Sequence, residues 1–129
     1  PEFFASQCEH LAMTQDAVMA HPFYKGFLEA PDRIEFWVYH KSPPGEDAAA
    51  VARRILHFAR SFRAAPEVAA GERDLVVACV THSPVMRAIL TQGLGIPDPG
   101  EPGWVEEIVI TVENDAMSYR FRDSTGAIA

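Results

Sequence analysis

Residues 74–90 read Asp-Leu-Val-Val-Ala-Cys-Val-Thr-His-Ser-Pro-Val-Met-Arg-Ala-Ile-Leu, and this stretch decides the predicted fold. The apolar run from Leu75 to Val80 predicts a buried strand, because an unbroken run of this length is typical of a sheet covered on both faces. A helix is predicted to follow over Pro84 to Leu94, with Ser83 as its cap and Pro84 in its first turn. The strand therefore ends at Thr81-His82, beside the start of a helix. That edge of an α/β sheet is where ligands bind, and free helix N–H groups suit a phosphate.

Upstream, the turn at Pro43-Pro44-Gly45 precedes the clearest predicted helix, which opens at Glu46 or Asp47. Its apolar residues share one face at helical spacing. These residues are Ala48, Val51, Ala52, Ile55, Phe58, Ala59 and Phe62. A second helix is predicted over His10 to Met19, with Ser6 as its cap, and residues 23–41 are expected to be irregular with short helical turns. Residues 66–73 are expected to form a loop.

Strand signals occur at both ends of the chain. Residues 104–113 and 116–122 predict a hairpin that turns at Asn114-Asp115, and the tail after Asp123 is expected to fray. Phe3-Phe4-Ala5 is interpreted as the end of a short strand. The element order predicts α/β layers around a sheet with at least one parallel pair. The sheet has few neighbours for a central strand and therefore looks incomplete.

Composition predicts a single domain over residues 1–129, since 48% of the residues are hydrophobic and suffice for one core. The net charge of −7 is unfavourable for nucleic-acid binding, which favours a basic surface. No apolar run approaches the roughly 20 residues that span a bilayer. No secretory leader is recognised, so we expect a cytoplasmic protein with no membrane partner.

Two cysteines, Cys8 and Cys79, show no framework spacing, so a disulfide is not expected. Cys79 is predicted to be buried within the strand. The sequence contains no CxxC pair and no HExxH motif, so neither a metal site nor another cofactor is expected.

Two motifs, in this order along the chain, resemble those of the histidine phosphatase superfamily, the phosphoglycerate-mutase-like enzymes. Pro43-Pro44-Gly45-Glu46-Asp47 is similar to the family's Pro-Gly-Glu-Ser segment before a long helix. Residues 80–90 are similar to the second histidine motif, whose usual form is Thr-His-Gly-Gly-Val-Ile-Arg. The resemblance covers roughly residues 42–122 and implies a three-layer α/β/α sandwich.

The resemblance also implies roles for individual residues. It makes His82 the second catalytic histidine, with Thr81 and Ser83 contacting the phosphate. The family's early phosphate-binding arginine corresponds to His10 in this sequence. A histidine makes one partly protonated contact where arginine offers a permanent planar fork, so phosphate affinity is reduced. Replacement of Gly-Gly by Ser83-Pro84 also removes one N–H donor.

Two further roles concern charged side chains. The resemblance implies an acid, upstream of Pro-Gly-Glu, that protonates the leaving oxygen. Glu29 is the candidate and Glu35 is the alternative. Arg87, one turn into the predicted helix, is interpreted as a surface or salt-bridge arginine rather than a phosphate ligand.

The family's nucleophile lies on a strand that ends in Arg-His-Gly, and this triplet does not occur in the 129 residues. The fold therefore lacks the first central strand, and several hypotheses stay open. In the first, the strand lies outside this sequence, and the chain is a phosphomonoester hydrolase or a mutase that forms a phosphohistidine. In the second, the chain is an inactive relative that binds a phosphate ligand or a protein. In the third, another chain supplies the strand, by strand exchange or in a homo-oligomer. The expected ligand is a small phosphorylated substrate or free phosphate.

Overall fold

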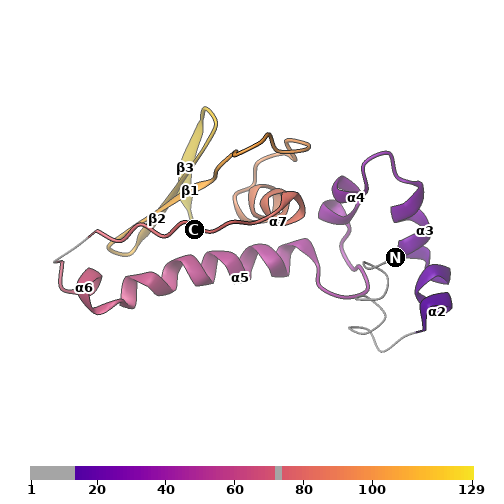
Figure 1. Cartoon of the computed structure of the whole chain (residues 1–129), viewed down its shortest axis with the longest axis horizontal. Helices are drawn as coiled ribbons and strands as arrows, with labels where there is room; N and C mark the ends of the chain where they lie inside the picture. Colours follow the sequence, from indigo (N-terminus) through magenta and orange to yellow (C-terminus); the bar gives the residue numbers. More distant parts are fainter. Residues whose placement is uncertain (1–13, 72–73) are drawn as a thin grey trace.

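The computed structural model describes residues 14–71 and 74–129. Helices make up the first two thirds of the described chain, and a small sheet ends it (Figure 1). The helical elements are α2 (Gln15–Ala20), α3 (Pro22–Glu29), α4 (Arg33–Tyr39), α5 (Ala48–Ser61), the 3-10 turn η1 (Phe62–Ala64), α6 (Pro66–Ala69), α7 (Ser83–Ala88) and the π-helical turn η2 (Ile89–Gly93). The strands are β1 (Val109–Glu113), β2 (Ala116–Phe121) and β3 (Ser124–Ile128).

Residues 23–41, expected to be irregular with short helical turns, fold instead into most of α3 and all of α4. Each helix begins with a side-chain cap. The ring nitrogen Nδ1 of His21 accepts from the N–H of Phe23 at 3.1 Å, directly before Pro22. The carboxylate of Asp32 accepts from the N–H groups of Ile34 and Glu35 at 2.9 and 3.0 Å. The start of each of these two helices is therefore set by a local cap, and neither helix is long enough to show an extended periodic spacing of apolar residues. The predictions for residues 1–13 lie outside the described residues.

The long helix α5 confirms the sequence prediction. Asp47 caps it by accepting from the N–H of Ala50, and a face that includes Val51 and Ala52 is buried. Phe58, predicted on the same face, is instead about half exposed. In Figure 1, α5 runs along the long axis of the molecule, and it contacts α7, η2 and β1. The loop predicted for residues 66–73 contains the single turn α6.

The sheet is antiparallel, with strand order β1-β2-β3. The predicted hairpin is confirmed, and Asn114 at its turn has a φ of 50°, which asparagine tolerates better than most residues. The tail expected to fray instead pairs with β2 as β3, from Phe121↔Ser124 to Met117↔Ile128. No parallel pair occurs among the described residues, so the predicted parallel pair is contradicted there. The described chain is thus an α/β structure of helices and one antiparallel sheet.

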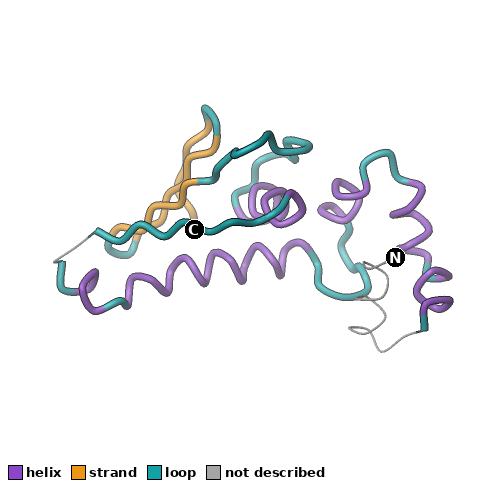
Figure 2. The backbone as a smooth tube through the Cα atoms, viewed as in Figure 1, coloured by secondary structure: helices purple, strands orange, loops and turns teal. Residues whose placement is uncertain are grey.

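The run Leu75 to Val80 is the main departure from prediction. Figure 2 draws it as loop between α6 and α7, and none of the described strands pairs with it. Val76 and Val80 are fully exposed, and Cys79 is exposed as well. The predictions of a buried, paired strand and of a buried Cys79 are therefore wrong for this structure. The physical reason is that a strand is stable only when a neighbour satisfies its backbone groups, and the described residues supply none here.

Some of the buried apolar side chains form two clusters. One joins α4, α5 and α7 through Val38, Ala48, Val51 and Ala88, and the other joins α2 and α3 through residues that include Tyr24. Trp37 packs against both clusters. The core therefore fixes α4 against α5 and α7, which carry the candidate site. Among the described residues, the structure contains no helix with the length and apolarity to cross a membrane.

Candidate functional site

The Thr81-His82-Ser83 motif lies where the loop after α6 meets α7. Thr81 and His82 are both exposed. His82 takes the cap position, with φ −129° and ψ 164°, and its side chain makes no capping bond. Ser83, predicted to be the cap, is instead the first helical residue, with Pro84 beside it in the first turn as predicted. His82 is therefore exposed to solvent at the start of α7.

The hydroxyl of Ser83 has a definite partner. It donates to Oε2 of Glu101 at 2.7 Å. Glu101 belongs to the proline-rich loop that follows η2, and its side chain is 71% exposed. The carboxylate of Glu101 therefore contacts the residue that follows His82, and the sequence analysis did not predict this contact.

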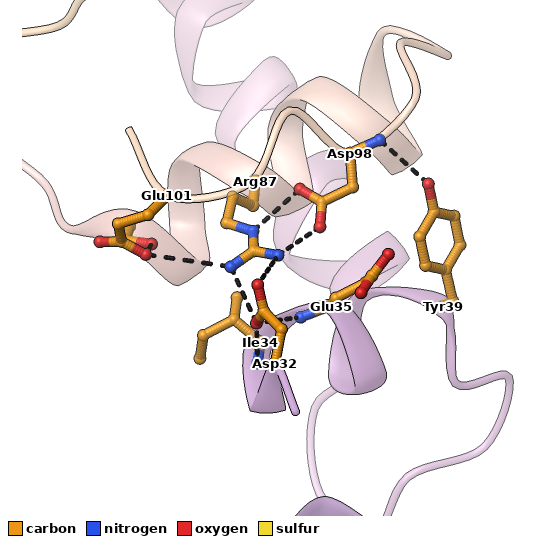
Figure 3. Close-up of polar contacts among 8 residues, drawn as sticks. Asp32, Ile34, Glu35, Tyr39, Arg87, Asp98 and Glu101 are labelled. Atoms are coloured by element: carbon orange, nitrogen blue, oxygen red, sulfur yellow. Dashed lines mark hydrogen bonds and ion pairs between the residues drawn. The ribbon is translucent and has the colours of Figure 1, made fainter. Parts of the chain in front are cut away.

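Behind Ser83, one turn along α7, lies the buried guanidinium of Arg87 (Figure 3), a residue that is only 1% exposed. Its Nη1 and Nη2 donate to the two carboxylate oxygens of Asp32 at 3.0 and 2.7 Å. Its Nε donates to Oδ1 of Asp98 at 2.8 Å, and its Nη2 also bonds to Oδ2 of Asp98. Hydrogen bonding to Asp98, and next to Asp32, raises the already high pKa of Arg87. Of the two interpretations left open for Arg87, the structure supports the salt bridge.

This ion network connects three segments that are far apart in the sequence. Asp32 caps α4, Arg87 lies in α7, and Asp98 lies in the loop after η2. The N–H of Asp98 also donates to the Tyr39 hydroxyl at 3.0 Å, at the other end of α4. The Gln92 amide donates to the carbonyl oxygen of Val38 at 2.9 Å. The loop that contains Asp98 is therefore held against α4.

The Asp32 carboxyl has a lowered pKa, caused first by its hydrogen bond from Arg87 and then by the N–H of Glu35. Because the folded pKa lies below the unfolded value of about 3.9, Asp32 stabilises the fold above that pH, and this contribution is lost as the pH falls through the folded pKa. We expect Asp32→Asn, which keeps a capping side chain, to lose stability at pH 6 and to show a shallower acid limb than the wild type. Urea unfolding between pH 6 and pH 2.5 measures this, with Asp16→Asn on α2 as an exposed control. Equal acid limbs for Asp32→Asn and the wild type would contradict the assignment.

The predicted acids lie on the neighbouring helices. Glu29 is exposed at the end of α3, and Glu35 is exposed on α4. Glu35 lines a shallow cavity of about 410 Å³ over α4, together with Asp32, Tyr39 and His40. A second cavity of about 340 Å³ lies between α4 and the start of α5. Neither of these two cavities is lined by His82 or Glu29.

His10, the third predicted phosphate contact, lies outside the described residues. Asp32, Asp98 and Glu101 were missed. Their only sequence signals are an aspartate before a short helix and an acidic, proline-rich loop, and neither signal identifies a partner. Among the described residues, no group of three or more His, Cys, Asp or Glu side chains is arranged to hold a metal ion.

A family model described as histidine phosphatase superfamily (branch 1) matches residues 20–104, which is more than half of the 129 residues. The chain therefore belongs to the histidine phosphatase superfamily, as its two motifs predicted. The matched stretch contains Thr81, His82, Ser83 and Glu29 but not His10. No curated protein and no solved structure matches the chain.

Proposed function

We propose that the chain forms part of a phosphatase that hydrolyses small phosphate monoesters, with His82 as the histidine that does not become phosphorylated. The observation that carries this proposal is the family match across the motif around His82. Exposure of the His82 side chain supports it, because a phosphate ester can reach the imidazole without displacing other protein groups. In this role His82 donates to a phosphoryl oxygen and stabilises the negative charge of the transition state.

The chemistry needs a second imidazole as nucleophile. Its nitrogen forms a bond to phosphorus while the bond from phosphorus to the alcohol oxygen breaks, and an acid, with Glu29 as the candidate, protonates that oxygen. Water then attacks phosphorus, the phosphorus–nitrogen bond breaks, and inorganic phosphate leaves. The reaction needs only protein side chains and water.

The nucleophile belongs, in this proposal, to a strand that is not within residues 1–129 and that pairs with residues 75–80. The apolar run from Leu75 to Val80, the exposure of Val76 and Val80, and the lack of a pairing strand among the described residues support this placement. An open strand edge of this kind is a template for strand pairing. A parallel strand there would end beside Thr81-His82, because parallel strands share one carboxyl edge. Its addition would place a sheet between helical layers, as in a three-layer α/β/α sandwich.

The gene sequence gives a direct test of the proposal. The reading frame upstream of Pro1, or a protein that co-purifies with the chain, is expected to contain Arg-His-Gly at the end of an apolar strand. Absence of such a segment from both would reject the enzyme hypothesis. Hydrolysis is then assayed with the chain together with that segment.

Replacement of His82 by alanine should lower kcat for the hydrolysis of p-nitrophenyl phosphate at least about 100-fold, because one lost transition-state donor has an effect of this size. The matched control is His57→Ala, since His57 is an exposed histidine on α5 away from the motif. Steady-state rates measured with both variants at saturating substrate test this. An unchanged kcat in His82→Ala would remove His82 from the mechanism.

A second candidate function is a non-catalytic relative that binds a phosphate ligand or a protein. This second candidate is favoured by the hydrogen bonds of Arg87, which donates to Asp32 and Asp98. Arg87 is the arginine closest to His82 in the sequence, and these bonds make it unavailable to a phosphate. This candidate predicts no turnover of aryl phosphates under any condition. Hydrolysis that disappears in His82→Ala would reject it.

A further inference from the structure

The guanidinium of Arg87, one helical turn after Ser83, has almost no N–H group without a hydrogen-bond acceptor. A guanidinium has five N–H groups, and four of those on Arg87 donate to Asp32 and Asp98. The remaining N–H belongs to Nη1, which lies 3.9 Å from Oε2 of Glu101. One positive charge therefore faces three carboxylates, so this group of four side chains carries a net negative charge.

Glu101 is the most exposed carboxylate of this group, since the side chain of Asp32 is only 39% exposed. The Glu101 side chain is 71% exposed, whereas that of Asp98 is only 2% exposed. Ser83 donates to Oε2, which fixes the carboxylate next to the residue that follows His82. The other oxygen, Oε1, has no hydrogen-bond donor among the described residues and is free to accept from a ligand.

We propose that Glu101 determines the substrate specificity of the His82 site, a proposal that rests on the function proposed above. Glu101 favours phosphate monoesters whose alcohol part carries an ammonium group, and it disfavours those with a second anionic group. Oε1 accepts a hydrogen bond from the ammonium group, and the anchored carboxylate repels a second anion. In water, two unit charges 4 Å apart change a binding constant about five-fold.

Two small probes with the same two-carbon skeleton separate this charge effect from size. Phosphoethanolamine carries an ammonium group, and phosphoglycolate carries a carboxylate at the corresponding position. Isothermal titration of the whole chain at low ionic strength should give a dissociation constant for phosphoethanolamine that is lower by a factor on the order of ten. Glu101→Gln should reduce this ratio at least about three-fold. Glu101→Asp, which keeps the charge, should retain most of the preference.

The matched control is Glu107→Gln, because Glu107 is also an exposed glutamate of this region and pairs with Arg120 on the sheet instead. Its preference for phosphoethanolamine should equal that of the wild type. Binding of both probes with a ratio that Glu101→Gln leaves unchanged would overturn the role of Glu101 and leave the proposed function standing. Loss of all binding in His82→Ala ties the measured site to His82. No binding of either probe to the wild type at millimolar concentration would overturn the role of Glu101, whereas the hydrolysis assay with His82→Ala tests the proposed function separately.

Discussion

Arg87→Ala should lower the free energy of unfolding by about 3–5 kcal/mol, the usual cost of leaving a buried carboxylate without its partner. The side chain of Asp98 is 2% exposed, so its charge cannot be solvated once the guanidinium is gone. The loss is large against a total stability of about 5–15 kcal/mol for a small domain. Urea unfolding followed by circular dichroism, with linear extrapolation to water, measures it.

Two further variants separate this mechanism from a general loss of packing. Arg54→Ala removes an exposed arginine that pairs with Glu46, and it should cost less than about 1 kcal/mol. The double variant Arg87→Ala, Asp98→Ala removes the guanidinium together with the Asp98 carboxylate that would otherwise stay buried without a partner. It should be less destabilised than the sum of the two single variants. Additive effects would show that Arg87 and Asp98 contribute independently, which contradicts the network in Figure 3.

The predictability of each element follows from the range of its interactions. α5 was predicted because its cap, Asp47, and its apolar face are encoded within one continuous segment. The turn at Asn114-Asp115 is similarly local. β3 was missed because its small and polar residues show no clear alternation. It is a strand because it pairs with β2.

The candidate site depends on contacts that no local pattern encodes. Asp32 lies 55 residues from Arg87, and Asp98 lies 11 residues away on the other side. The sequence therefore left Arg87 with two interpretations, and only the fold distinguishes them. His82 and Ser83 were recognised because they form one motif with their neighbours, whereas Glu101 gains its place only through the loop held by Asp98.

The error over residues 75–80 has the same origin. An apolar run of this length predicts a strand in a covered sheet. Pairing and burial, however, require a neighbour. The exposed valines are therefore consistent with a sequence suited to a sheet whose other strands are not among the described residues.

Two leucines on either side of α7 give the second large prediction. Leu90 in η2 is 0% exposed, on a segment that packs against α5, whereas Leu75 is 49% exposed. Leu90→Ala should lower the free energy of unfolding by about 2–5 kcal/mol, through lost apolar burial and the cavity left behind. Leu75→Ala should cost less than about 1 kcal/mol in the chain alone, because much of its side chain already contacts water. Urea unfolding of both variants measures the difference.

The same pair also tests the open strand edge. Equal costs for Leu75→Ala and Leu90→Ala in the chain alone would show that residues 75–80 are already packed, which contradicts their exposure. If a strand that carries the nucleophile pairs with this segment, the cost of Leu75→Ala should rise when that strand is present. The cost of Leu90→Ala should stay the same, since Leu90 is fully buried without the strand. A Leu75→Ala cost that does not change on addition of the strand would place the nucleophile elsewhere.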